Sequence, residues 1–156
     1  MSHRSTRLLR PDDWHLHLRD GSALRAVVSA TAQVFRRAIV MPNLTPAITT
    51  TGAARAYRER IRLALPTGSA FEPLMTLYLT DDTSADEIAR AKQSGLVHAA
   101  KYYPAGATTN SQSGVTSLAR AYPALAALER HGVVLSVHGE GTHPDVHIFH
   151  RPPVSL

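Results

Sequence analysis

Two histidines separated by one residue are the first feature of this sequence that could do chemistry. His15 and His17 lie within residues 14–18, a short run that we predict to be a strand opened by the Pro-Asp-Asp before it. Side chains two positions apart on a strand point to the same face, so both imidazoles are expected to face one side, as two ligands of one metal ion must. Arg19 continues this face if the strand extends that far. The alternative is a pair of histidines exposed on an edge strand.

A lysine in an apolar strand is the second unusual feature. The 17 Lys and Arg residues include only two lysines, and Lys101 lies in a predicted strand while Lys92 lies in a predicted helix. A buried ammonium is strongly unfavourable unless it is compensated. A lysine there would serve as an amine of low pKa, as a Schiff base, or as a carbamate that holds metals. A lysine paired at the mouth of the strand is the alternative.

Other polar side chains follow predicted strands. Asn43 comes directly after one apolar run and could simply be a turn residue, and His138 ends another strand, where a histidine often has a structural role. A looser group near the end of the chain contains His143, His147 and His150. Pro144 interrupts that group, which makes it a weak candidate for a metal site.

The elements that must position these residues alternate regularly between strands and helices. We predict strands at 14–18, 38–41, 73–80, 97–103 and 133–138, and helices at 22–35, 53–65, 84–94 and 117–131, with Pro123 indicating a late start or a kink in the last helix. Repeated units of this kind predict an α/β fold with a parallel sheet, either open or closed into a (β/α)8 barrel. The turn after the first strand has no GxGxxG, which disfavours a nucleotide-binding open sheet.

The length of the chain bears on this choice. A complete barrel typically needs about 250 residues, and this chain has 156. We therefore expect either the first five or so β/α units of a truncated TIM-type barrel or a complete open sheet. In a barrel, active sites gather at the carboxyl ends of the strands. The six candidates His15, His17, Arg19, Asn43, Lys101 and His138 all fall on strands or just beyond them.

Composition and charge exclude several classes of function. The chain has no cysteine and therefore no disulfide framework or thiolate metal site, which is compatible with a reducing cytoplasm, where we expect the protein. It has no run of 18 apolar residues, so we expect no membrane span, and its N-terminus does not resemble a secretory signal. The net charge of +5 permits nucleic-acid binding, but the arginines are dispersed along the chain. A dispersed charge is a weak footprint, and we expect no nucleic-acid partner.

Longer blocks of sequence extend these observations. The chain carries, in order, RPDDWHLHLRDG, AIVMPNLTP, LMTLYLTD, AAKYYPAGATTNSQSGVT and LSVHGE. From about residue 10 to 148 these blocks resemble consecutive blocks of the bacterial-type dihydroorotases, which are cyclic amidohydrolases with a barrel fold. The resemblance implies reversible cyclisation of N-carbamoyl-L-aspartate to L-dihydroorotate in pyrimidine biosynthesis, through a zinc-bound hydroxide at a two-metal site. It also implies a small anionic substrate and a homodimer.

The same resemblance implies roles for individual residues. His15 and His17 match the pair that binds the more buried zinc, Lys101 matches a carbamylated lysine that bridges both zinc ions, and His138 matches a ligand of the second zinc. Arg19 and Asn43 match residues that hold the substrate carboxylate. Thr108 and Thr109 lie in a segment that matches a mobile loop over the substrate.

The resemblance also implies that part of the site is missing. The family places a further zinc-binding histidine and an aspartate base on later strands, and Asp145 lies too close to the fifth strand to replace that base. We therefore expect one incomplete metal-dependent barrel domain over residues 1–156, with an irregular tail from 139 and impaired activity. The alternatives are a related amidohydrolase of the hydantoinase, dihydropyrimidinase or allantoinase type, and a catalytically inactive half-barrel that serves as an interaction module.

Overall fold

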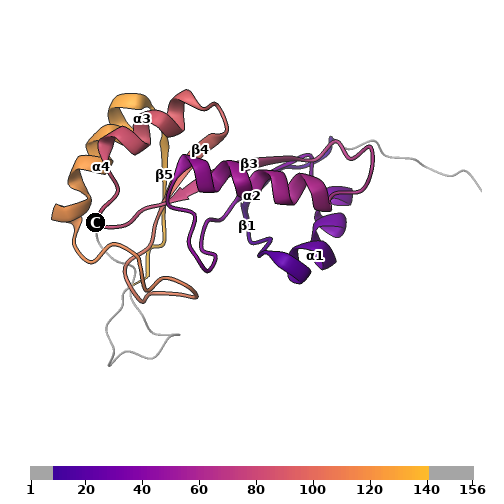
Figure 1. Cartoon of the computed structure of the whole chain (residues 1–156), viewed down its shortest axis with the longest axis horizontal. Helices are drawn as coiled ribbons and strands as arrows, with labels where there is room; N and C mark the ends of the chain where they lie inside the picture. The colour runs from indigo at the N-terminus through magenta and orange to yellow at the C-terminus, as the bar shows by residue number, and fades with distance from the viewer. Residues whose placement is uncertain (1–8, 141–156) are drawn as a thin grey trace, which may run out of the picture.

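A computed structural model describes residues 9–140 of the chain. The chain alternates strand and helix throughout this range. The strands are β1 (Asp13–Leu16), β2 (Arg37–Val40), β3 (Glu72–Tyr78), β4 (Val97–Tyr102) and β5 (Val134–Val137), and the helices are α1 (Gly21–Val34), α2 (Thr51–Ala64), α3 (Ala85–Gln93) and α4 (Leu118–His131). In Figure 1, α1 lies at one end of the molecule and α3 and α4 lie at the other, with α2 between them.

All five strands belong to one parallel sheet. They follow one another in the order β1-β2-β3-β4-β5, so that each strand pairs with its neighbours in the sequence. Parallel neighbours need a crossover connection, and a helix supplies each of the four crossovers. The predicted α/β fold with a parallel sheet is confirmed, and the described part forms a half-barrel.

The helices cover one face of the sheet and form the main core with it. Each helix buries one stripe, for example Leu24, Val28 and Ala32 on α1, against strand residues such as Val40 and Leu77. This 3.6-residue spacing is the pattern that an amphipathic helix needs to cover a sheet. No helix within residues 9–140 is long and apolar enough to cross a membrane.

The opposite face of the sheet carries the residues of chemical interest at one end and an apolar hollow at the other. This hollow measures about 550 Å³. Its walls include Trp14, Ile39, Leu74, Ala99 and Val134. Trp14 and Val134 are more than half exposed, at 61% and 64%. Parallel sheets are normally covered on both faces, so the described part of the chain leaves apolar strand surface open on this side.

Two predicted boundaries differ from the structure in ways that matter for the site. The first strand ends at Leu16 rather than at residue 18, because its pairing with β2 shifts between Asp13 and Leu16 and because Asp20 caps the following helix through the backbone N–H of Gly21. The predicted strand therefore ends two residues too late. Pro123 lies inside α4, which begins at Leu118, so the late start that it suggested is wrong.

Candidate active site

His15 and His17 come together beside the end of β1. Their Nε2 atoms lie 3.2 Å apart, and their ring centroids are 5.1 Å apart with an angle of 52° between the planes. The backbone N–H of His15 donates to Asp13 Oδ1 at 2.9 Å, which fixes the start of this segment. Two imidazole nitrogens at this separation point toward a common position, as the sequence predicts.

The surroundings of both histidines lower their pKa and so favour the neutral form. Burial lowers the pKa of His15, and the positive charge of Lys101 adds to this effect. Burial also lowers the pKa of His17, followed by the charge of Arg19, while a hydrogen bond with the Asn43 side chain acts in the opposite direction. A neutral imidazole is the form that binds a metal ion.

Lys101 is buried within the sheet, with only 2% of its surface exposed. Its neighbours in register are Tyr78 on β3 and Ser136 on β5. The Nζ atom lies 3.4 Å from Ser136 Oγ and 5.3 Å from the centre of the Tyr103 ring. Burial lowers the pKa of this amine, because removal from water disfavours the ammonium form. A lysine with a lowered pKa more readily provides the free amine from which a carbamate forms.

His138 lies one residue beyond β5. Its backbone N–H donates to the carbonyl of Tyr102 at 3.0 Å, which continues the pairing of β5 with β4. Its ring centroid lies 6.0 Å from that of Tyr103. Its Nε2 atom is buried without a hydrogen-bond partner and lies 3.5 Å from a carboxylate oxygen of Glu140. This ring nitrogen makes no hydrogen bond within the described residues, and the Glu140 carboxylate is an acidic neighbour.

Asn43 connects the end of β2 to the long loop after β4. Only 2% of its surface is exposed. Its Nδ2 donates to the carbonyl of Thr109 at 2.9 Å, and Asn110 Nδ2 donates in return to the carbonyl of Asn43 at 3.1 Å. Tyr78 Oη donates to the carbonyl of Asn110 at 3.2 Å. These three hydrogen bonds hold the tip of the loop over the end of the sheet.

The loop itself, residues 104–116, is ordered by hydrogen bonds between its own residues. Ser111 is fully buried, and its hydroxyl accepts from the N–H of Thr108 and donates to the carbonyl of the same residue. Thr108 is half-buried and Thr109 is exposed. Asn43 binds the backbone carbonyl of Thr109 and not its side chain. The contact between this loop and the other candidates is therefore made by the backbone.

Arg19 is exposed and adopts a left-handed backbone conformation, with φ of 60°. Its carbonyl accepts a hydrogen bond from Tyr57 Oη at 2.6 Å, and Tyr57 on α2 is buried. The positive charge of Arg19 contributes to the lowered pKa of His17. Arg19 lies three residues beyond the end of β1.

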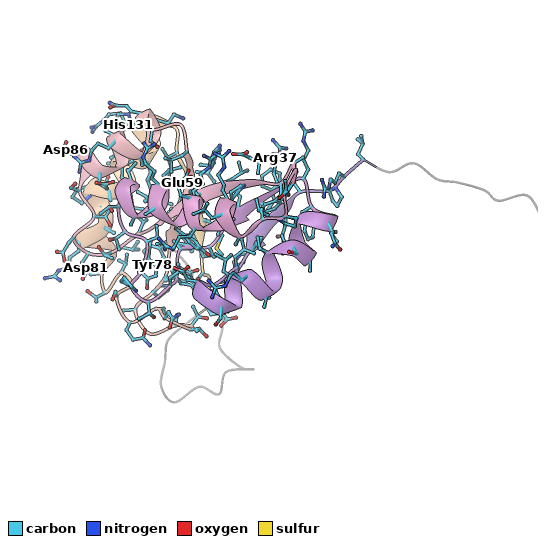
Figure 2. The ribbon with its side chains drawn as sticks, turned by 45° about the vertical axis from the view of Figure 1, so that its right-hand side comes forward. Arg37, Glu59, Tyr78, Asp81, Asp86 and His131 are labelled. Carbon is cyan, nitrogen blue, oxygen red and sulfur yellow. The ribbon has the colours of Figure 1, made fainter. Side chains whose placement is uncertain are left out.

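The structure thus gathers the predicted residues at the carboxyl end of the sheet. His15 and His17 lie at the end of β1, Asn43 follows β2, Lys101 lies near the end of β4 and His138 follows β5. In Figure 2, Tyr78, at the end of β3, lies below and to the left of Arg37, at the start of β2. The tail candidates Asp145, His143, His147 and His150 lie outside the described residues.

Sequence reasoning missed three side chains on this face, namely Tyr78, Tyr103 and Ser136. Tyr78 and Ser136 flank Lys101 in register, and Tyr103 follows it by two positions, so that all three share its side of the sheet. The two-residue spacing to Lys101 and to His138 could have identified Tyr103 and Ser136. Tyr78 required the register between β3 and β4.

Comparisons with known proteins place this arrangement in context. No family model matches the chain. It is 64% identical over 149 residues to a dihydroorotase of Methylobacillus flagellatus and 63% identical over 149 residues to one of Cupriavidus necator, in each case with 96% of this chain and 43% of the relative covered. The chain therefore spans less than half the length of these curated relatives.

Solved structures agree with the sequence matches. A dihydroorotase from Campylobacter jejuni is similar with a TM-score of 0.79 and 37% identity, over 86% of this chain and 39% of that one. A Saccharomyces cerevisiae dihydroorotase in complex with 5-fluoroorotic acid has a TM-score of 0.78 and 32% identity, over 93% and 39%. An L-hydantoinase from Arthrobacter aurescens has a TM-score of 0.68 at 17% identity, over 85% and 29%, and shows likeness of fold alone. The chain is thus homologous to the dihydroorotases and corresponds to a part of their length.

Proposed function

We propose that this chain carries one part of a dihydroorotase active site, which in its complete form interconverts N-carbamoyl-L-aspartate and L-dihydroorotate with loss or gain of water. The observation that carries the proposal is the gathering of His15, His17, Lys101 and His138 at one end of the sheet, in a chain that is 64% identical to a named dihydroorotase over 149 residues. The hydantoinase likeness extends to the fold only, so the related amidohydrolases are not favoured.

The donor atoms fit a metal centre. His15 and His17 direct two Nε2 atoms 3.2 Å apart toward one position, and His138 Nε2 is buried without a hydrogen-bond partner. Within residues 9–140 no group of three or more His, Asp, Glu or Cys side chains could hold a metal ion by itself. A carbamate on Lys101 would therefore be needed as a further ligand. Bound zinc would supply Lewis-acid activation of water and of the substrate carbonyl.

The substrate-binding part of the proposal rests on Arg19, Asn43 and the loop. An arginine fork recognises a planar carboxylate through two parallel hydrogen bonds. Asn43 lies within hydrogen-bonding reach of His17 and of the loop carbonyl of Thr109, so it is fixed beside the proposed metal ligands. Thr108 and Thr109 would reach the substrate as the loop moves. Cytoplasmic location and a homodimer are further parts of this proposal.

Zinc titration of the 156-residue chain tests the metal site. We expect the unchanged chain to bind one zinc ion tightly and His15→Ala to weaken binding by at least tenfold, since zinc usually needs at least three protein ligands. His131→Ala is the matched control, because His131 ends α4 and lies outside the gathered residues. Equal zinc affinity in the unchanged chain and His15→Ala would contradict the proposed site.

A complementation assay tests the activity. We expect little turnover of L-dihydroorotate by the chain alone, and turnover when it is co-expressed with the part of the M. flagellatus relative that the chain does not match. Lys101→Ala should abolish this turnover, whereas Lys92→Ala should retain it, because Lys92 is exposed and donates only to the carbonyl of Gly132. A host strain without its own dihydroorotase excludes contaminating enzyme. Retained turnover in Lys101→Ala would refute the role of Lys101.

A further inference from the structure

Tyr103 has a buried hydroxyl with no hydrogen-bond partner. Only 1% of the residue is exposed, and its Oη is one of three such orphaned side-chain atoms within residues 9–140, with Thr76 Oγ1 and His138 Nε2. A buried polar group without a partner is uncommon in native proteins and requires an explanation, such as a bound water, an ion or a ligand. The metal site proposed above uses His138 but leaves the hydroxyl of Tyr103 unexplained.

The ring that carries this hydroxyl is held firmly among the site residues. It lies 5.1 Å from the ring of Tyr78, with 32° between the planes, and 6.0 Å from that of His138. Lys101 Nζ lies 5.3 Å from its centre. The backbone of Tyr103 is fixed as well, because its carbonyl accepts from the N–H of Val115 at 2.8 Å. A side chain packed on three sides presents its hydroxyl in one direction.

The surroundings of this hydroxyl favour an anion as its partner. Arg19 follows β1 and Tyr103 follows β4, so both lie at the carboxyl end of the parallel sheet. A phenol hydroxyl is a hydrogen-bond donor, and in Tyr103 this donor has no partner among the described residues. An unused donor at the same end of the sheet as a guanidinium suits an oxygen of negative or partly negative charge.

We propose that the Tyr103 hydroxyl donates a hydrogen bond to an oxygen of the anionic ligand that Arg19 binds. This inference rests on the proposed function and adds a ligand-binding residue to it. The neighbouring Tyr102 offers a matched comparison, because it belongs to the core between sheet and helices and so faces the other side of the sheet. Replacing either tyrosine with phenylalanine removes one oxygen and keeps the ring.

The test measures the affinity of the zinc-loaded 156-residue chain for L-dihydroorotate by NMR titration, with ¹³Cζ-labelled tyrosine as a second readout. We expect Tyr103→Phe to bind the ligand at least tenfold more weakly, a change of about 1.4 kcal/mol, and Tyr102→Phe to bind it as the unchanged chain does. The ¹³Cζ signal of Tyr103 should shift on ligand addition, and that of Tyr102 should not. Zinc affinity should be the same in all three proteins.

The outcomes separate this inference from the proposed function. Ligand binding that is equal in Tyr103→Phe and the unchanged chain, with no shift of the Tyr103 signal, overturns the inference and leaves the proposed function standing. No ligand binding by the unchanged chain overturns both. A thermal midpoint that falls in Tyr103→Phe while ligand affinity is unchanged would assign the hydroxyl to a buried structural water, and this also overturns the inference.

Discussion

Gly114 provides a sharp test of how the loop beside the site is built. A Cβ added at this position would lie 2.9 Å from the carbonyl oxygen of Ser111, 3.2 Å from the Cα of Ala105, and closer still to the carbonyl oxygen of Tyr103. All three atoms belong to the backbone, so no flexible side chain can move aside. Gly114→Ala must therefore displace the segment that pairs with Tyr103.

The expected magnitude follows from this overlap. Inserting a methyl group into a well-packed position costs about 1–3 kcal/mol, and each kcal/mol lowers the thermal midpoint of a domain of this size by roughly 2–4 °C. The hydrogen bonds at risk are those from Val115 N–H to Tyr103 at 2.8 Å and from Gly114 N–H to Ser111 at 2.9 Å. We expect Gly114→Ala to lower the midpoint by about 2–12 °C.

The same substitution elsewhere should act in the opposite direction. Gly52 lies in the first turn of α2, where an added Cβ meets nothing closer than 4.0 Å. Gly52→Ala should stabilise the protein by about 0.4–1 kcal/mol, because alanine restricts the unfolded chain. Circular dichroism melts of both variants at one protein concentration provide the measurement. A midpoint for Gly114→Ala at or above that of the unchanged chain would refute the packing argument.

Three further predictions concern the loop and the open face. Hydrogen bonds from the side chain and backbone of Thr116, and more weakly from Arg120, lower the pKa of Asp81 to about 2. The stabilising effect of the ionised Asp81 carboxylate is therefore present above pH 3.8 and disappears as the pH falls toward 2. Acid titration of stability should therefore show Asp81→Asn less stable than the unchanged chain above pH 4 and the two equal near pH 2; a constant difference would contradict this. Asn43→Ala removes the hydrogen bond that the Asn43 side chain donates to the carbonyl of Thr109. The amides of residues 108–111 should then exchange with solvent about five- to tenfold faster, as expected for the loss of a hydrogen bond of about 1 kcal/mol. Unchanged exchange would show that Asn43 does not hold the loop. Trp14→Ser should reduce self-association in sedimentation experiments, because exposed apolar surface is sticky; a monodisperse unchanged chain would remove the basis for this expectation.

The order of strands and helices was predictable because their signals are local. Apolar runs stopped by proline or glycine, and Ser84 as the cap of α3, lie within a few residues of the elements that they define, and Ser84 does accept from the N–H of Glu87. The predicted common face of His15 and His17 also rested on a local rule, the alternation of side chains along strands. These features need no knowledge of distant parts of the chain.

Features that depend on distant residues were not predictable. Asn43 binds the loop 66 residues further along, and no local pattern indicates that its amide is engaged by Thr109. The carbonyl of Arg19, a residue in the left-handed conformation, accepts a hydrogen bond from Tyr57 Oη, 38 residues further along. The orphaned hydroxyl of Tyr103 is visible only when every neighbour is placed. Tertiary contacts decide all three.

The strand order has a consequence for how the chain acquires its structure. Within residues 9–140, each strand after the first pairs with the one just before it, so every new unit docks onto an edge that is already formed. Contacts between neighbouring units close short loops, which lowers the entropy cost of each step. During synthesis the polypeptide can therefore fold progressively from its N-terminal side, as domains do when they emerge in order from the ribosome. On this reasoning, ribosome-bound intermediates should protect β1 and β2 before β5 has been made.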